Sequence, residues 1–137
     1  DTAGNCGNQI STLMVRGMAL GEVEPSDFIR VLGKELRVSC IVGAVLGLVN
    51  GLRIYLMYGV IYAGKYDNVV GYALVVSISL FISVMLAKLV GGMLPLAAKK
   101  LGADPAIMAT PFITTIVDAC SLILYFQIAM LIFHNMM

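Results

Sequence analysis

Three long apolar stretches dominate the chain, at residues 38–64, 69–96 and 105–134. Each is long enough to cross a membrane, because an α-helix rises about 1.5 Å per residue and roughly 20 apolar residues cover the hydrocarbon layer. Short polar segments separate them, at residues 65–68 and 101–104. This pattern predicts three complete transmembrane helices joined by tight connections.

Two segments of different character precede these stretches. Residues 1–21 are rich in small and polar side chains and fit either a flexible loop or a helix. In a helix, Gly4, Asn8 and Thr12 share one face, because they are four residues apart. Residues 25–37 combine apolar positions at helical spacing with charged neighbours, which is typical of an amphipathic helix at a membrane surface. The overall prediction is an all-α fold, a polytopic membrane helix bundle with an added interfacial helix.

Glycine spacing predicts where two of these helices approach each other. Gly43, Gly47 and Gly51 recur every four residues, and small residues at that interval let helix backbones pack closely in lipid. A second group of residues is expected instead to weaken the last turns of the 69–96 helix: Gly91, Gly92 and Pro95.

Composition supports a membrane protein and excludes several other classes. The chain is 60% hydrophobic and 12% charged, whereas soluble domains average about 45–50% and about 25%. Its net charge is +1, without a basic block interleaved with aromatic residues, so no nucleic-acid role is indicated. The three cysteines form no CxxC pair, and no nucleophile–base pair is visible, so the sequence does not favour an enzyme.

Basic residues predict how the chain is oriented. They concentrate in residues 16–37 and recur in the 97–104 connection, whereas the 65–68 turn has one lysine. Because cytoplasmic loops carry an excess of Lys and Arg, residues 16–37 and 97–104 are expected in the cytoplasm. The C-terminus is then expected outside.

Asp118 is the principal candidate for chemistry. It lies near the middle of an otherwise uncharged stretch, and a carboxylate at that depth costs at least about 2.5–3.5 kcal/mol. Such a residue normally faces protein or a water-filled path. Thr110, Thr114 and Asp118 share one oxygen-bearing face, and Pro111 is expected to break the helix and free carbonyls toward a cavity.

These oxygen atoms predict a path for a hard divalent cation. Carboxylate, hydroxyl and carbonyl ligands suit Mg²⁺, Ca²⁺ and Mn²⁺. A single carboxylate best suits Mg²⁺, which keeps several of its waters, and one acid per chain favours a symmetric oligomer that pools two. The alternative is a structural ion pair between Asp118 and Arg53 or Lys88.

The sequence also carries the motifs of a known family. They are AGNCGNQISTLMVRGMALGEV near the start, KEL followed by Gly43 and Gly47, and AKLVGGMLPLAAKKLGADPAIMATPFITTIVDACSLILYF in the second half. Together they closely resemble the transmembrane domain of MgtE-type magnesium channels over nearly the whole chain. The resemblance implies a multi-pass bacterial inner-membrane Mg²⁺ channel that works as a homodimer. Its pore lies on the dimer axis, lined by the family's second helix, matching residues 1–21, and fifth helix, matching residues 105–134.

The resemblance also implies roles for individual residues. Asp118 matches the aspartate that binds hydrated Mg²⁺, and Thr114 matches a position whose backbone carbonyl faces the ion. Asp104 matches a weaker cation site at the cytoplasmic end. Residues along the second helix match the wall of the path, namely Gly4, Asn8 and Thr12. Glu35 matches an acidic position in the helix that precedes the third span. Two positions depart from the family pattern: Thr110, where some relatives have Asn or Ser, and Lys88, where some have Asn.

In this interpretation the chain is a partial transmembrane domain. It lacks the first helix, the start of the second, and the cytoplasmic sensor and CBS domains of the parent protein. It is therefore expected to carry part of the conduction machinery without the feedback gate. Mn²⁺, Co²⁺ and Ca²⁺ are expected competitors of Mg²⁺. Two other functions stay open, an ion-coupled secondary transporter and a structural anchor bundle in the lipid bilayer.

Overall fold

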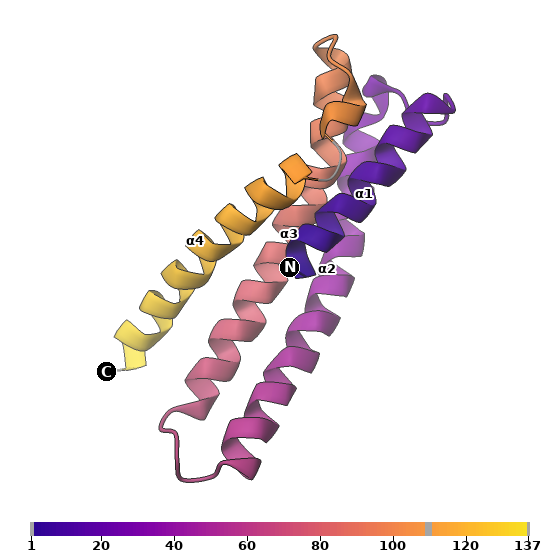
Figure 1. The fold of residues 1–137 in the computed structure, drawn as a ribbon. Helices are drawn as coiled ribbons and strands as arrows, with labels where there is room; N and C mark the ends of the chain where they lie inside the picture. Colours follow the sequence, from indigo (N-terminus) through magenta and orange to yellow (C-terminus); the bar gives the residue numbers. More distant parts are fainter. Residues whose placement is uncertain (1, 109–110, 137) are drawn as a thin grey trace.

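The computed structural model describes residues 2–108 and 111–136, and over these residues the chain is a helical membrane bundle without strands. Figure 1 shows the arrangement. The helices in chain order are α1 (Thr2–Ala19), the 3₁₀ turn η1 (Pro25–Asp27), α2 (Phe28–Ile54), the π-helix η2 (Tyr55–Ile61), α3 (Val69–Lys100), the 3₁₀ turn η3 (Pro105–Met108) and α4 (Pro111–Met136).

Three helical segments are long and apolar enough to span a membrane, which confirms the predicted number among the described residues. They cover Pro25–Ile61, Val69–Lys100 and Phe112–His134. At about 1.5 Å per residue, α2 with 27 residues, α3 with 32 and α4 with 26 measure about 39–48 Å. Each exceeds the ~30 Å hydrocarbon layer.

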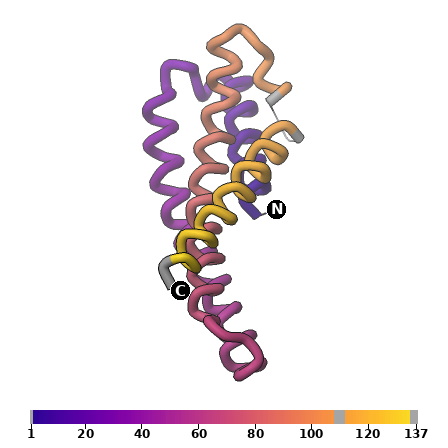
Figure 2. The backbone as a smooth tube through the Cα atoms, turned by 90° about the vertical axis from the view of Figure 1, so that its left-hand side faces the viewer, coloured from indigo at the N-terminus to yellow at the C-terminus, as the bar shows by residue number. Residues whose placement is uncertain are grey.

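α3 is the central helix, and it contacts α1, α2 and α4. α2 and α3 run antiparallel, joined by the turn at residues 62–68, and α1 lies against them at the other end (Figures 1 and 2). α4 starts near that same end and runs alongside α3 (Figure 1). Near the C-terminal end of α4, Phe133 packs against Tyr72 of α3, with ring centroids 5.3 Å apart. The connections after α1 and after α3 therefore meet at one end of the bundle, where Lys99 Nζ donates to the Met18 carbonyl at 3.4 Å.

The predicted glycine spacing packs α2 against α3. A Cβ built on Gly43 would come 3.1 Å from the Phe81 carbonyl oxygen, and one on Gly47 would come 2.9 Å from that of Ser77. Gly51 faces the Ser77 hydroxyl in the same way. Because a side chain at these positions would collide with α3, the glycines set how closely the two backbones approach.

The end of α3 differs from the prediction. The helix continues through Pro95 to Lys100, and its glycines are packing positions rather than weak points. A Cβ on Gly91 would collide with the Gly7 carbonyl oxygen, and one on Gly7 would come 2.9 Å from that of Ala87. The crossing of α1 and α3 thus explains why the sequence has glycine there. Two buried apolar clusters flank it, Ile10, Met14, Met18, Val31 and Leu96, and Ala3, Ala87, Ile113 and Val117.

Two predicted boundaries also differ. Residues 25–37 do not form a separate interfacial helix, because α2 runs without interruption from Phe28 to Ile54. Its buried face already includes Val31 and Glu35, so this segment packs into the bundle. The last apolar stretch is not one helix from Pro105: a 3₁₀ turn covers Pro105–Met108, and α4 begins at Pro111.

Candidate functional site

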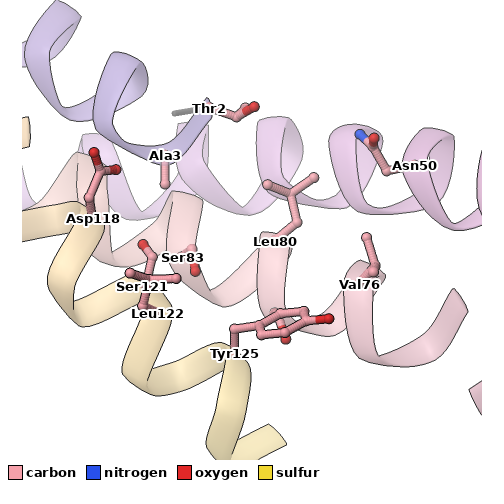
Figure 3. Close-up of a pocket in the computed structure, with 11 residues that line it drawn as sticks. Thr2, Ala3, Asn50, Val76, Leu80, Ser83, Asp118, Ser121, Leu122 and Tyr125 are labelled. Atoms are coloured by element: carbon pink, nitrogen blue, oxygen red, sulfur yellow. The ribbon is translucent and has the colours of Figure 1, made fainter. Parts of the chain in front are cut away.

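Asp118 lies two turns into α4 and is half-buried against α1. A Cβ built on Gly4 would come 2.9 Å from Asp118 Oδ1 and 3.1 Å from Thr114 Cγ2. Figure 3 shows the Asp118 carboxylate reaching toward α1, close to Ala3. The structure therefore brings together three of the predicted site residues, and it does so because Gly4 has no side chain to occupy the space.

The other predicted residues of α1 continue along the same helix. Of the two alternatives for residues 1–21, a flexible loop or a helix, the structure shows a helix over Thr2–Ala19, as the family resemblance implied. Asn8 is half-buried, and its side-chain oxygen is buried without a hydrogen-bond partner in the described part of the chain. Thr12 is exposed, and its hydroxyl donates to the Asn8 backbone carbonyl at 3.0 Å. Asn8 thus offers an unused amide oxygen, whereas the Thr12 hydroxyl already has a local acceptor.

Two predicted residues lie elsewhere or outside the description. Asp104 is exposed in the connection after α3, where its Oδ1 accepts from the Ala106 backbone N–H at 2.9 Å. It caps the 3₁₀ turn that begins at Pro105, and the structure does not group it with Gly4 and Asp118. Thr110 falls outside the described residues.

A cleft of about 520 Å³ extends from Asp118 between α3 and α4. Figure 3 shows its walls, with Ser83 and Leu80 on α3, Ser121 and Tyr125 on α4, and Asn50 on α2. Thr2 and Ala3 of α1, with Val76 and Ser79 of α3 and Leu122 of α4, complete the lining. The sequence analysis missed the serines. Their spacing was a usable signal, because Ser79 and Ser83 are one turn apart and Ser121 is one turn beyond Asp118.

A second acid, Glu35, forms a buried ion pair that was not predicted from the sequence. Glu35 is 2% exposed, although it lies in the segment predicted as an amphipathic helix at the membrane surface. Lys88 Nζ lies 4.0 Å from Glu35 Oε2, and both side chains are largely buried. At this distance the two groups form an ion pair, because the separation is too long for a hydrogen bond. Lys88 therefore has a structural partner on α2, while Arg53, the other cation considered for Asp118, is exposed.

The side chains around Asp118 limit how this residue can bind a metal ion. Among the described residues, no group of three or more His, Cys, Asp or Glu side chains lies close enough to hold an ion. A carboxylate with neighbouring hydroxyl and amide oxygens suits a cation that keeps its own water, as Mg²⁺ does. The arrangement fits outer-shell contacts to a hydrated divalent cation.

The fold and this site define a class of protein: a helical membrane bundle with a half-buried acid held against a glycine on the neighbouring helix. Residues 1–128 match the family model of MgtE, described as a divalent cation transporter, and the chain belongs to this family. It is 35% identical to the magnesium transporter MgtE of Thermus thermophilus over 131 residues, which are 96% of this chain and 27% of that protein.

Two further relatives give the same result. The magnesium transporter MgtE of Enterococcus faecalis is 35% identical over 93% of this chain and 26% of its own length. That of Bacillus subtilis is 32% identical over 97% of this chain and 28% of its own length. The chain therefore spans only about a quarter of the length of these curated relatives.

Proposed function

We propose that this chain is part of a channel that passes hydrated Mg²⁺ across the bacterial inner membrane. The single observation that carries the proposal is the contact between Asp118 of α4 and Gly4 of α1 inside a membrane bundle. A carboxylate at this depth is costly unless it meets water, a cation or a polar group of the protein. Membership of a family described as divalent cation transporters supports the same ion class.

In this proposal Asp118 attracts the ion and neighbouring oxygen atoms contact its water ligands. Gly4 leaves space beside the carboxylate, Thr114 adjoins it, and Asn8 presents a buried amide oxygen with no partner in the described chain. Passage is passive. Moving a divalent cation inward at 100 mV is worth about 4.6 kcal/mol, twice the ~2.3 kcal/mol for one charge.

We infer further that two copies form the pore at a dimer axis. A hydrated divalent cation is best balanced by two carboxylates, and each chain supplies one at this site. The end that carries Lys99, Lys100 and the connection after α1 would face the cytoplasm, in line with the distribution of basic residues. Asp104 would then be a weaker cation site at that cytoplasmic entrance.

Replacement of the carboxylate tests the proposal directly. We expect Asp118→Asn to lower Mg²⁺ uptake by the full-length protein about 100-fold, the upper range for losing a group that contacts a metal's ligands. Uptake would be measured in proteoliposomes under an imposed membrane potential. Asp67→Asn is the matched control, because Asp67 is exposed in the 62–68 turn. Asp104→Asn should have an intermediate effect.

The same assay separates the alternatives. Unchanged uptake by Asp118→Asn would make Asp118 structural and contradict the proposed ion path, whereas no uptake by the unaltered protein would leave a membrane anchor as the better description. Uptake that requires a Na⁺ or H⁺ gradient, and fails under the membrane potential alone, would favour an ion-coupled secondary transporter. A channel needs neither gradient.

A further inference from the structure

The Asp118 cleft, defined above by its lining, contains hydroxyl groups that the packing of the bundle does not explain. Ser79 of α3 is 4% exposed, and its oxygen is buried without a hydrogen-bond partner among the described residues. The Ser121 oxygen on α4 is likewise buried and has no partner within residues 2–108 and 111–136. Both residues line the cleft together with Asp118. Two different helices thus place hydroxyls without a partner among the described residues in the same cleft as Asp118.

Two other polar side chains of this bundle, Ser39 and Asn50, form local hydrogen bonds. The Ser39 hydroxyl donates to the Leu36 carbonyl at 2.9 Å, and the Asn50 amide donates to the Leu46 carbonyl at 3.0 Å. Bonding to a carbonyl in the preceding turn is the usual solution for a hydroxyl in a helix. Ser79 and Ser121 do not adopt it, so their hydroxyls are available to a ligand in the cleft.

The missing partner for these groups is water. Buried hydroxyls in native proteins are nearly always hydrogen-bonded to protein or to ordered water, and the hydrocarbon of a membrane offers no substitute. A water molecule needs polar partners and takes up about 30 Å³ in the liquid. The cleft of about 520 Å³ has room for several, and Ser79, Ser121 and Asp118 all contribute to its lining.

We propose that the Asp118 cleft is water-filled and that Ser79 and Ser121 bind the outer water of a divalent cation held at Asp118. The cation part of this inference rests on the proposed function. Hydroxyls accept from and donate to water equally well, so they suit a ligand that arrives as a hydrated ion. α3, outside the two helices expected to line the pore, then contributes directly to the ion's surroundings.

Cysteine accessibility tests for the water. In full-length protein with Cys6, Cys40 and Cys120 replaced by serine, Ser79→Cys and Ser121→Cys should react with a membrane-impermeant thiosulfonate reagent. Ser39→Cys should not react, because Ser39 is fully buried in α2, and Asp67→Cys in the exposed turn is the positive control. Failure of both cleft cysteines to react, while the Asp67→Cys protein does, would overturn the proposal.

Protection by the ion tests for the cation. Millimolar Mg²⁺ should slow labelling of Ser79→Cys, and the protection should disappear when Asp118→Asn is added. In the protein that keeps Cys6, Cys40 and Cys120, Ser79→Val should weaken the apparent Mg²⁺ affinity about tenfold. That is the lower range for a group that contacts a metal's ligands. Ser121→Ala offers a smaller change if Ser79→Val fails to fold, and Ser39→Ala is the matched control.

These outcomes distinguish the two proposals. Labelling without Mg²⁺ protection or any change in Mg²⁺ affinity would overturn the assignment of the serines to the ion's hydration shell. Normal uptake by Asp118→Asn would instead contradict the proposed function, and it would leave the water accessibility of the cleft as a separate result.

Discussion

Two acids lie inside this bundle, and their surroundings differ. Glu35 is buried between α2 and α3, and Lys88 Nζ approaches its carboxylate to 4.0 Å. Asp118 is half-buried, faces Gly4 on α1 and lines a cleft with Ser83 and Ser121. A lysine of the chain provides the counter-charge at the first acid. At the second, small residues leave space beside the carboxylate.

The difference is the reason that we propose Asp118, and not Glu35, for transport. An acid and a lysine buried together stabilise each other but leave nothing for a mobile ion, and either one alone is strongly unfavourable. An acid beside a glycine and a polar cleft has space next to it for a cation that enters with water, which is the role we propose for Asp118. In a membrane bundle, the side chains around an acid therefore say more about its role than its burial does.

Breaking the Glu35–Lys88 pair should have the largest effect on stability. We expect Glu35→Leu or Lys88→Leu to destabilise the protein by about 3–5 kcal/mol, because each leaves an uncompensated buried charge. The double variant should recover most of this loss, since two apolar side chains replace the pair. Thermal unfolding of detergent-solubilised protein would measure both. A double variant as unstable as the single variants would show that loss of the ion pair is not the cause of the destabilisation.

The glycine contacts between helices should have a smaller effect. Gly91→Ala should destabilise by about 1–3 kcal/mol, the usual cost of forcing an extra group into a packed site, because its methyl group would collide with the Gly7 carbonyl oxygen. The matched control is Gly33→Ala in α2, where no atom of the described chain lies within 4 Å of the built Cβ. That change should stabilise by about 0.5–1 kcal/mol through helix propensity alone. Equal effects of the two changes, measured by thermal unfolding, would contradict a packing role.

Much of the fold could be predicted from the sequence. Long apolar stretches gave the three spanning helices, and the four-residue glycine spacing gave the α2–α3 contact, because both signals are local. The structure has no helix boundary near residue 37, where one was expected, because α2 runs from Phe28 to Ile54. Of the charged residues in this segment Glu35 turns inward, whereas Arg30, Lys34 and Arg37 are exposed. Whether a charge in a helix faces solvent or a partner depends on a residue far along the chain, here Lys88.

The candidate site could be predicted only in part, because the sequence gives local signals and not the distant neighbours of a residue. Asp118 stood out as a lone charge in an apolar stretch, and the four-residue spacing of Gly4, Asn8 and Thr12 indicated a helix face. The cleft could not be predicted, because Ser79 and Ser121 meet only through the angle between α3 and α4. The gaps that helices leave as they diverge follow from side-chain packing along their whole length.

Replacement of Gly4 should have the smallest effect on stability. It is also the most specific test of the difference between the surroundings of Asp118 and Glu35. A methyl group on Gly4 would lie 2.9 Å from Asp118 Oδ1 and would displace a side chain that can rotate. The helix-propensity gain of about 0.5–1 kcal/mol should offset this displacement, so Gly4→Ala should leave stability nearly unchanged. Its apparent Mg²⁺ affinity should nevertheless fall about tenfold, because the carboxylate no longer occupies the space beside the glycine.

A double-mutant cycle decides whether Gly4 acts through Asp118. If it does, Gly4→Ala should have no further effect on Mg²⁺ uptake once Asp118 is replaced by asparagine, because coupled residues are non-additive. Independent, additive losses would mean that Gly4 serves the ion path in another way. Comparison with Gly33→Ala, which places the same methyl group on a helix with open space around it, would separate a local effect at Asp118 from a general effect of alanine on these helices.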